Sequence, residues 1–394
     1  MFRTKEEKVN KGKGYIVGVL ILAIGMLLSA CSGGGSGGGQ GGVEQLPKAQ
    51  KALENLEGNV LSTGPHGEKP TPAEEIQLTD EELQKIKGMN ATAAIVMHYG
   101  GDDWSRAQIN GLTTRFKEMG IELVATTDAD FDPGKQVSDI ETVLAQDPDI
   151  IVSIPTDPVA TADAYRKAAE QGVELVFMDN VPDGFQQGKD YVSVVSADNY
   201  GNGVASAHML ASSLGGEGKV GAIYHAADFF VTQQRYEGFQ KTMKEEYPDI
   251  EIVADQGVAG PDFASQAEEA TSAMLTENAD LKGMWAVWDV PAEGVLAGAR
   301  TAGRNDLSVT TIDLGTTAAI ELASGGMIKG VGAQRPYDQG VTEANLAGYA
   351  LLDKEAPPYV AVPVLPVTEG NVLDAWQEAY SQEPPEKVRE AAAE

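Results

Sequence analysis

Cysteine and histidine are scarce in this sequence. Its 394 residues include one cysteine, Cys31, and four histidines. A single cysteine excludes an intrachain disulfide and any metal cluster held by several cysteines. The histidines do not show the ligand spacing of a known zinc site. We therefore expect no metal and no cofactor.

Basic residues are also few. The chain has 29 lysines and arginines against 59 aspartates and glutamates, which gives a formal net charge of -30. An acidic surface repels the phosphate backbone of nucleic acids and the anionic head groups of membranes. We therefore expect no nucleic acid partner, and we expect the body of the protein to stand away from the bilayer.

One apolar run, at residues 15–28, has the layout of a targeting signal. It is too short for a stable membrane span, and basic residues precede it, as in a secretory signal. It ends in Leu28, Ser29, Ala30 and Cys31, which resembles the bacterial lipobox, whose cysteine becomes the lipidated N-terminus. We predict a lipoprotein signal peptide over residues 1–30 and an extracytoplasmic protein held to the membrane only by lipid on Cys31. An uncleaved membrane helix is the alternative.

Residues 31–90 contain little that could form a core. Residues 32–42 are almost entirely glycine and serine, a composition that forms a flexible tether. Residues 43–88 are polar, with proline and glutamate scattered through short helical patterns. We predict a loosely ordered acidic stalk there.

From residue 91 onward, short apolar runs alternate with amphipathic helical stretches. This alternation predicts parallel sheets with helices on both faces. The rhythm occurs twice and the chain is long enough for two lobes, so the expected fold class is α/β with two doubly wound parallel-sheet lobes. Strand candidates lie at 93–97, 122–125, 150–153, 174–178 and 192–195 in the first half, and at 219–224, 251–254, 283–287, 308–312 and 328–332 in the second.

Polar or aromatic residues follow nearly every predicted strand. In open α/β sheets, ligands bind beyond the carboxyl ends of the strands. Taken singly, such residues are commonly helix N-caps or turn residues, but their recurrence in both halves favours a binding site. They are His98-Tyr99, Pro155-Thr156-Asp157, Asp179-Asn180, Ser196 with Asp198-Asn199, His225, Trp288-Asp289, Asp313 and Gln334-Arg335.

The order and spacing of several short segments resemble the periplasmic sugar-binding proteins of the ribose-binding type, which have the type I periplasmic binding fold. The similarity runs from about residue 91 to residue 368. The matching segments are Ile154-Pro155-Thr156-Asp157, Val176-Phe177-Met178-Asp179, Ser196-Ala197-Asp198-Asn199 with Gly201, Arg235-Tyr236-Glu237-Gly238-Phe239, Trp288-Asp289 with Gly294, Thr311-Ile312-Asp313, and Gly332-Ala333-Gln334 with Pro336.

The resemblance implies two lobes joined by three crossing strands, with a sugar held between them. The crossings would fall near Ala197, Gln334 and Leu365. The N-terminal lobe would comprise residues 91–197 plus 335–365, the C-terminal lobe residues 198–334 plus 366–380, and residues 381–394 would form a tail. Such a protein passes its ligand to the permease and ATPase subunits of an ABC importer, and we expect a monomer.

The resemblance places Asp179, Arg235, Asp289, Asp313 and Gln334 on sugar-contacting positions. Carboxylates accept hydrogen bonds from adjacent hydroxyls and an arginine donates in a fork, so these groups can read the stereochemistry of a ring. Aromatic side chains cover the C–H surface of a sugar ring. The candidate ligand-binding set is completed by Tyr99, Asp102, Asp103, Trp104, Asn180, Phe230 and Trp288.

Three positions depart from the ribose-type pattern. Asn180 stands where ribose binders have an arginine, Ile154 replaces an asparagine and Ile312 replaces a phenylalanine. These departures argue against ribose itself. A pentose, a hexose, a deoxy sugar or a polyol remains open, as does a furanone signalling molecule, which related proteins also bind.

Other functional classes find less support in the residues. A hydrolase needs a nucleophile beside a base, or paired carboxylates, and no nucleophile elbow accompanies the strand-end histidines His98 and His225. We therefore expect no enzyme. A transcription regulator with this fold needs a basic helix-turn-helix where this chain has its predicted signal. A receptor that presents its ligand to a chemotaxis or sensor partner remains the alternative to an import protein.

Overall fold

The computed structural model describes residues 46–227 and 229–393. The predicted signal peptide, the lipidation site Cys31 and the Gly/Ser tether therefore lie outside the described residues. Within the described part, two sheets carry the fold, and their inner strands are largely buried, several of them as apolar runs. Runs of this kind are typical of parallel strands, whose two faces are both covered by helices.

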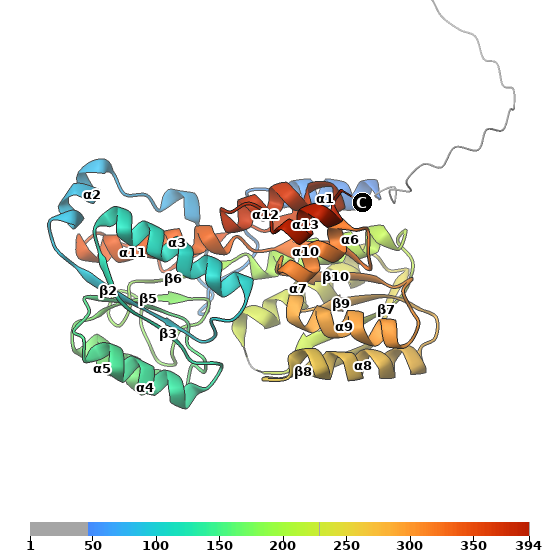
Figure 1. Ribbon diagram of the computed structural model, residues 1–394, viewed down its shortest axis with the longest axis horizontal. Helices are drawn as coiled ribbons and strands as arrows, with labels where there is room; N and C mark the ends of the chain where they lie inside the picture. The colour runs from blue at the N-terminus through green and yellow to red at the C-terminus, as the bar shows by residue number, and fades with distance from the viewer. Residues whose placement is uncertain (1–45, 228, 394) are drawn as a thin grey trace, which may run out of the picture. The chain divides into compact units, whose positions relative to one another are not determined.

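The first sheet has seven parallel strands in the order β1-β12-β6-β5-β4-β2-β3. Helices α2 (Asp80–Lys87), α3 (Asp103–Met119) and α11 (Pro336–Leu351) cover one face, and α4 (Pro133–Leu144) and α5 (Ala162–Glu170) cover the other (Figure 1). The strands are β1 (Thr71–Pro72), β2 (Thr92–Met97), β3 (Glu122–Asp128), β4 (Ile150–Ser153), β5 (Glu174–Met178), β6 (Ser193–Ala197) and β12 (Tyr359–Val362).

The second sheet has six strands in the order β13-β11-β10-β9-β7-β8, and only β13 runs antiparallel to its neighbour. Its strands are β7 (Gly218–His225), β8 (Ile250–Val258), β9 (Leu281–Ala286), β10 (Ser308–Ile312), β11 (Ile328–Ala333) and β13 (Leu365–Val367). The predicted α/β class with two parallel sheets is confirmed, and each predicted strand overlaps an observed one.

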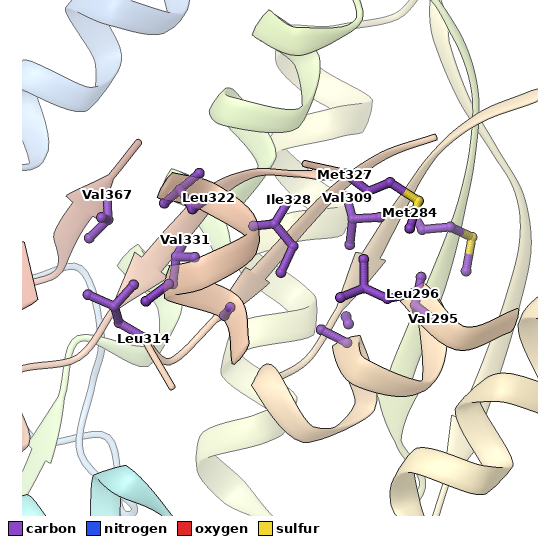
Figure 2. Close-up of a cluster of buried hydrophobic side chains, with 14 of the residues drawn as sticks. Met284, Val295, Leu296, Val309, Leu314, Leu322, Met327, Ile328, Val331 and Val367 are labelled. Carbon is purple, nitrogen blue, oxygen red and sulfur yellow. The ribbon is translucent and has the colours of Figure 1, made fainter. Parts of the chain in front are cut away.

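Helices also cover both faces of the second sheet. On one face lie α6 (Asn199–Ser213) and α7 (Phe230–Glu246). Figure 2 shows the core on the other face, where Met284, Val309 and Ile328 from the strands meet Leu296 and Leu322 from helices. The helices on that face are α8 (Phe263–Glu277), α9 (Asp289–Thr301), α10 (Thr316–Ala323), α12 (Val372–Tyr380) and α13 (Glu386–Ala391).

The chain passes between the two sheets three times. It leaves the first sheet after β6 and enters the second at β7, with α6 between them. It returns through α11 after β11. The third passage is the shortest, because only Pro363 and Val364 separate β12 from β13.

The expectation of a loosely ordered stalk over residues 43–88 is wrong for the described part. Helix α1 (Pro47–Leu56) packs on α6, β1 pairs with β12, and the 3-10 helix η1 (Ala73–Glu75) leads toward α2. Several apolar side chains of this segment are buried, and Ile86 is 0% exposed. The carboxylate of Asp198 also accepts hydrogen bonds from the backbone N–H groups of Leu61 and Ser62 and from the Ser62 hydroxyl. Tertiary packing therefore orders a segment whose composition resembles a linker.

The C-terminal residues also differ from the expected tail. After η2 (Glu369–Asn371) and α12, the chain forms α13, which packs against α10 and buries Val388 completely. One buried valine on a short helix gives too weak a periodic signal to be read from sequence.

Among the described residues, no helix combines the length and apolar character needed to cross a bilayer.

Candidate ligand-binding cleft

A cavity of about 410 Å³ lies at the carboxyl ends of the strands of both sheets. Residues after β2, β4 and β5 line it from the first sheet, and residues after β7, β9, β10 and β11 line it from the second. This volume falls in the range of pockets that enclose small molecules. The sequence-based expectation of functional residues at strand ends therefore leads to one shared cavity.

Arg235 is the only lysine or arginine among the described residues that line the cavity. Its Nε donates to Asn199 Oδ1 at 2.8 Å, and its Nη1 lies 3.3 Å from both the Val287 carbonyl oxygen and Asp313 Oδ2. Gln334 Nε2 donates to the other oxygen of Asp313 at 2.7 Å. The guanidinium and the Asp313 carboxylate are thus held in fixed orientations, as a stereoselective site requires.

Close packing of α6 on α7 sets the position of Arg235. A side chain at Gly203 would collide with the Arg235 carbonyl, and one at Gly238 would collide with the Tyr200 carbonyl. The two glycines let the helix backbones approach closely, so that the arginine side chain reaches the end of the sheet from the N-terminal part of α7.

Asp179 reaches the same cavity from the first sheet. Its carboxylate accepts a hydrogen bond from Ser196 Oγ at 2.6 Å, and Ser196 Oγ in turn accepts from Asn199 Nδ2 at 2.8 Å. Because Asn199 also accepts from Arg235, a continuous hydrogen-bonded chain runs from Asp179 to Asp313. Burial raises the pKa of Asp179 to about 6, against the opposing effects of Ser196 and Arg235.

Asp179 and Asp313 share an unusual backbone conformation. Asp179 has a φ of 54° and Asp313 a φ of 67°, and each directly follows a strand. Aspartate adopts this left-handed region more readily than most residues because its short polar side chain can hydrogen-bond locally. The same local conformation therefore presents a carboxylate at the end of one strand in each sheet.

Aromatic rings form the walls of the cavity. His98, Trp104 and Phe131 lie on the side of the first sheet, and His225, Phe229, Phe263 and Trp288 lie on the side of the second. The two groups meet where Phe131 packs edge-to-face on Phe263, with ring centroids 6.0 Å apart. Burial lowers the pKa of His98 and of His225 to about 4, so both imidazoles are neutral at pH 7. The histidines are therefore part of the wall.

The carboxylates of Asp102 and Asp289 also line the cavity. Asp102 caps α3, because its Oδ1 accepts from the Ser105 N–H at 2.7 Å, and burial raises its pKa. Asp289 begins α9, and its carboxylate lies so close to Gly315 that a Cβ at residue 315 would collide with it in its present position. Burial, followed by the nearby carboxylates of Asp313 and Asp102, raises the pKa of Asp289 well above its usual range.

Eight residues of the predicted set line the cavity, and four do not. Tyr99 stacks behind Phe131 with centroids 4.9 Å apart, and Asp103 hydrogen-bonds to Thr316. Asn180 is buried outside the lining, and Phe230 is the first residue of α7 while its neighbour Phe229 lines the cavity. The eight lining residues are Asp102, Trp104, Asp179, Arg235, Trp288, Asp289, Asp313 and Gln334.

The sequence-based set omitted several lining residues, most of them in loops. Phe131 and Phe263 follow β3 and β8, which lie at the outer edges of the two sheets. Phe131 has a φ of 56°, and this conformation is rare for a bulky side chain and marks functional sites. An aromatic residue shortly after an edge strand was the available signal. The other omitted residues are His98, Asp130, Ile154, Thr156, His225, Ala227, Phe229, Val231, Thr232, Gly260 and Pro261.

Metal binding finds no support in the described residues. No group of three or more histidine, cysteine, aspartate or glutamate side chains in this part of the chain could hold a metal ion. The carboxylates of the cavity are available for hydrogen bonds to an organic ligand.

Comparisons with known proteins agree with this geometry. A family model described as periplasmic binding protein domain matches residues 93–356. The chain is 26% identical over 255 residues to the ribose import binding protein of Bacillus subtilis, covering 64% of this chain and 79% of that protein. It is 25% identical over 252 residues to the D-apiose import binding protein of Actinobacillus succinogenes, covering 64% and 78%.

Solved structures show the same fold. A periplasmic solute-binding protein of an ABC transporter from Actinobacillus succinogenes, solved with bound D-allose, aligns with a TM-score of 0.65 and 25% identity, covering 72% of this chain and 99% of that one. A solute-binding protein from Bacillus halodurans, solved with bound myo-inositol, aligns with a TM-score of 0.64 and 18% identity, covering 74% and 98%.

Proposed function

Since this chain belongs to the periplasmic binding protein family, we propose that it captures a small sugar or polyol in the cavity between its two sheets and delivers it to an ABC importer. The relatives support this ligand class, since their names specify ribose and D-apiose, and the solved structures contain D-allose and myo-inositol. The relatives are binding proteins, and this chain is a binding protein and not an enzyme.

The observation that carries the proposal is the hydrogen-bonded chain from Asp179 to Asp313 around the cavity. It offers carboxylate oxygens as acceptors and the Arg235 guanidinium as a donor, and the whole network is buried. Hydrogen bonds to charged groups are stronger than those between neutral groups, so a few correctly placed hydroxyls give both affinity and selectivity. Trp288 and Phe131 provide apolar faces for the C–H surface of the ligand.

The proposed binding cycle uses the passages of the chain between the sheets as a hinge. A ligand first binds to the residues of one sheet. Closure then brings the residues of the other sheet onto the ligand, and these additional interactions stabilise the closed form. The direct packing between the two sides, such as that of Phe131 on Phe263, would form on closure.

The proposed location is outside the cytoplasm, as is typical of the family. We expect signal peptide removal and lipid attachment at Cys31, which would tether the protein to the membrane through the predicted Gly/Ser segment. The proposed partners are the permease and ATPase subunits of an importer. The protein would act as a monomer, and the permease would bind its closed form.

A thermal-shift screen of the protein lacking residues 1–31 tests the proposal. Pentoses, hexoses and polyols are compared with amino acids of similar size. A ligand present at 100 times its dissociation constant adds about 2.7 kcal/mol of stability, so we expect a rise in Tm of several degrees for at least one polyhydroxyl compound. An Arg235→Ala variant serves as the control that should lose this response. Stabilisation by amino acids alone would contradict the proposal.

A further inference from the structure

Acidic side chains far outnumber basic ones in the lining of the cavity. Five carboxylates line it, while Arg235 provides the only side-chain cation among its described lining residues. His98 and His225 contribute no charge at pH 7, because burial lowers the pKa of each to about 4. The five carboxylates are those of Asp102, Asp130, Asp179, Asp289 and Asp313.

The guanidinium group of Arg235 already has interaction partners within the protein. It pairs with Asp313, and it donates to Asn199 and to the Val287 carbonyl. Asp179, for its part, accepts from the Ser196 hydroxyl. Asp179 and Asp313 therefore have partners within the protein, and so does Asp102, whose Oδ1 accepts from the Ser105 N–H.

Asp289 differs from them. Within residues 46–227 and 229–393, no side chain or backbone N–H donates a hydrogen bond to its carboxylate and no cation pairs with it. The largest charge effects on its pKa come from other carboxylates, those of Asp313, Asp102, Glu293 and Asp103. Asp289 is partly buried at the wall of the cavity, and its carboxylate has neither a donor nor a cation within the described part of the protein, so a ligand that supplies one would stabilise it.

The surroundings of Asp289 suit a cation for a second, independent reason. Trp288 lies beside it in sequence and in the cavity, with Phe263 packed on Trp288 at 4.9 Å between ring centroids. Trp104 lines the cavity near Asp102. The faces of tryptophan and phenylalanine attract cations, and the attraction is strongest in desolvated sites.

We propose that the natural ligand is a polyhydroxyl compound carrying an ammonium group, an amino sugar or an amino polyol, with its ammonium held by Asp289 and Asp102 against the indole rings. This inference rests on the proposed function and narrows its ligand class. The hydroxyls of the ligand are bound by Asp179, Arg235 and Asp313. An ammonium group has three N–H donors, enough to serve both carboxylates. The same excess of acidic side chains disfavours sugar phosphates and sugar acids.

Calorimetry with matched ligand pairs tests this assignment. Glucosamine, galactosamine and 1-amino-1-deoxysorbitol are each titrated against the neutral compound with a hydroxyl in place of the amine, and against N-acetylglucosamine. We expect the amine of the preferred pair to bind at least about tenfold more tightly than its neutral counterpart, since charge-assisted bonds are roughly twice as strong as neutral ones. Acetylation should abolish the preference.

The variant Asp289→Asn tests whether the Asp289 carboxylate causes the preference for the amine. It should reduce the amine preference about tenfold or more, because an amide cannot neutralise an ammonium group. Asp249→Asn is the matched control: it makes the same change of charge at an exposed residue away from the cavity and should leave the preference unchanged.

The outcomes separate this inference from the proposed function. Tighter binding of the neutral member of every pair, or an amine preference that survives Asp289→Asn, overturns the inference and leaves sugar or polyol binding intact. Binding of no member of any pair overturns the inference and counts against the proposed function as well.

Discussion

Asp103 of α3 caps helix α10 of the other sheet at Thr316. Its Oδ2 accepts hydrogen bonds from the Thr316 backbone N–H and from the Thr316 hydroxyl, both at 2.8 Å. The N-cap of α10 is Gly315, which has no side chain to accept those bonds. The N-terminus of a helix on one side of the cavity is therefore satisfied by a residue from the other side. This interaction forms only when the two sides are close.

The first prediction concerns this interaction. Asp103→Ala should weaken the closed arrangement by on the order of 1 kcal/mol, the usual value of an N-cap, and so reduce ligand affinity by roughly fivefold to tenfold. Small-angle scattering of the ligand-free protein should report a larger radius of gyration, and calorimetry the loss of affinity. Asp103→Asn is the control, since asparagine caps helices as well as aspartate does. An unchanged radius and affinity in the alanine variant would show that Asp103 does not contribute to closure.

The second prediction concerns Arg235. Arg235→Ala leaves the buried Asp313 without its cation, which typically costs about 3 to 5 kcal/mol, and it removes a donor from the cavity. We expect a lower free energy of unfolding and a loss of ligand affinity of at least about 100-fold. Arg235→Lys keeps the charge but cannot donate to Asn199 and Asp313 together. Its free energy of unfolding and its ligand affinity should therefore lie between those of the wild type and those of the alanine variant. Equal ligand affinity of the wild type and the two variants would show that Arg235 does not bind the ligand.

The third prediction concerns pH. The pKa of Asp179 is raised to about 6 in the folded protein, so the folded state binds the proton more tightly than the unfolded state, whose pKa is near 3.8. The contribution of Asp179 to stability is therefore greatest below the unfolded pKa and is lost as pH rises through about 6. Relative to Asp179→Asn, the wild type should lose roughly 2 to 3 kcal/mol of unfolding free energy between pH 4 and pH 7.

Asparagine is a suitable comparison at this position, because it tolerates the positive φ of residue 179 and its amide oxygen can still accept from Ser196. Denaturant unfolding of both proteins at several pH values measures the difference. Parallel pH profiles would mean that Asp179 is ionised as readily in the folded chain as in the unfolded chain.

The fourth prediction concerns residues 46–90. A protein that begins at Ala91 loses β1 from the edge of the first sheet and uncovers the core that Ile76, Leu78 and Ile86 help to close. We expect it to aggregate or to unfold at a lower temperature than a protein that begins at Leu46. Size-exclusion chromatography and thermal unfolding compare the two. Equal behaviour would restore the interpretation of this segment as a stalk.

The sequence predicted the sheets well and the segment before them poorly, for one physical reason. Strand β4, for example, is buried on every residue, and its apolar run alone identifies it. In residues 46–90 the apolar side chains are isolated among prolines and glutamates, and only a tertiary partner reveals that they are buried. Leu56, for example, is 4% exposed because it packs with Met209 of α6.

The residues of the candidate site also form two groups, one that the sequence predicts and one that it does not. Asp179, Asp313 and Gln334 directly follow strands, so their positions in space follow from the sheet order. Phe131 lies in a loop and Phe263 begins α8 directly after one, and the paths of these loops depend on packing that no pattern in the sequence fixes. The strand-end histidines were visible in the sequence, but their role as neutral aromatic walls depends on burial, which the structure alone reveals.

A crystal structure of the protein with the tightest-binding compound from the ligand screen tests the central claim most directly. We expect the compound to occupy the cavity, with hydroxyls within hydrogen-bond distance of Asp179, Arg235 and Asp313 and its C–H surface against Trp288 or Phe131. A ligand bound elsewhere, with this cavity filled only by water, would contradict the proposed function.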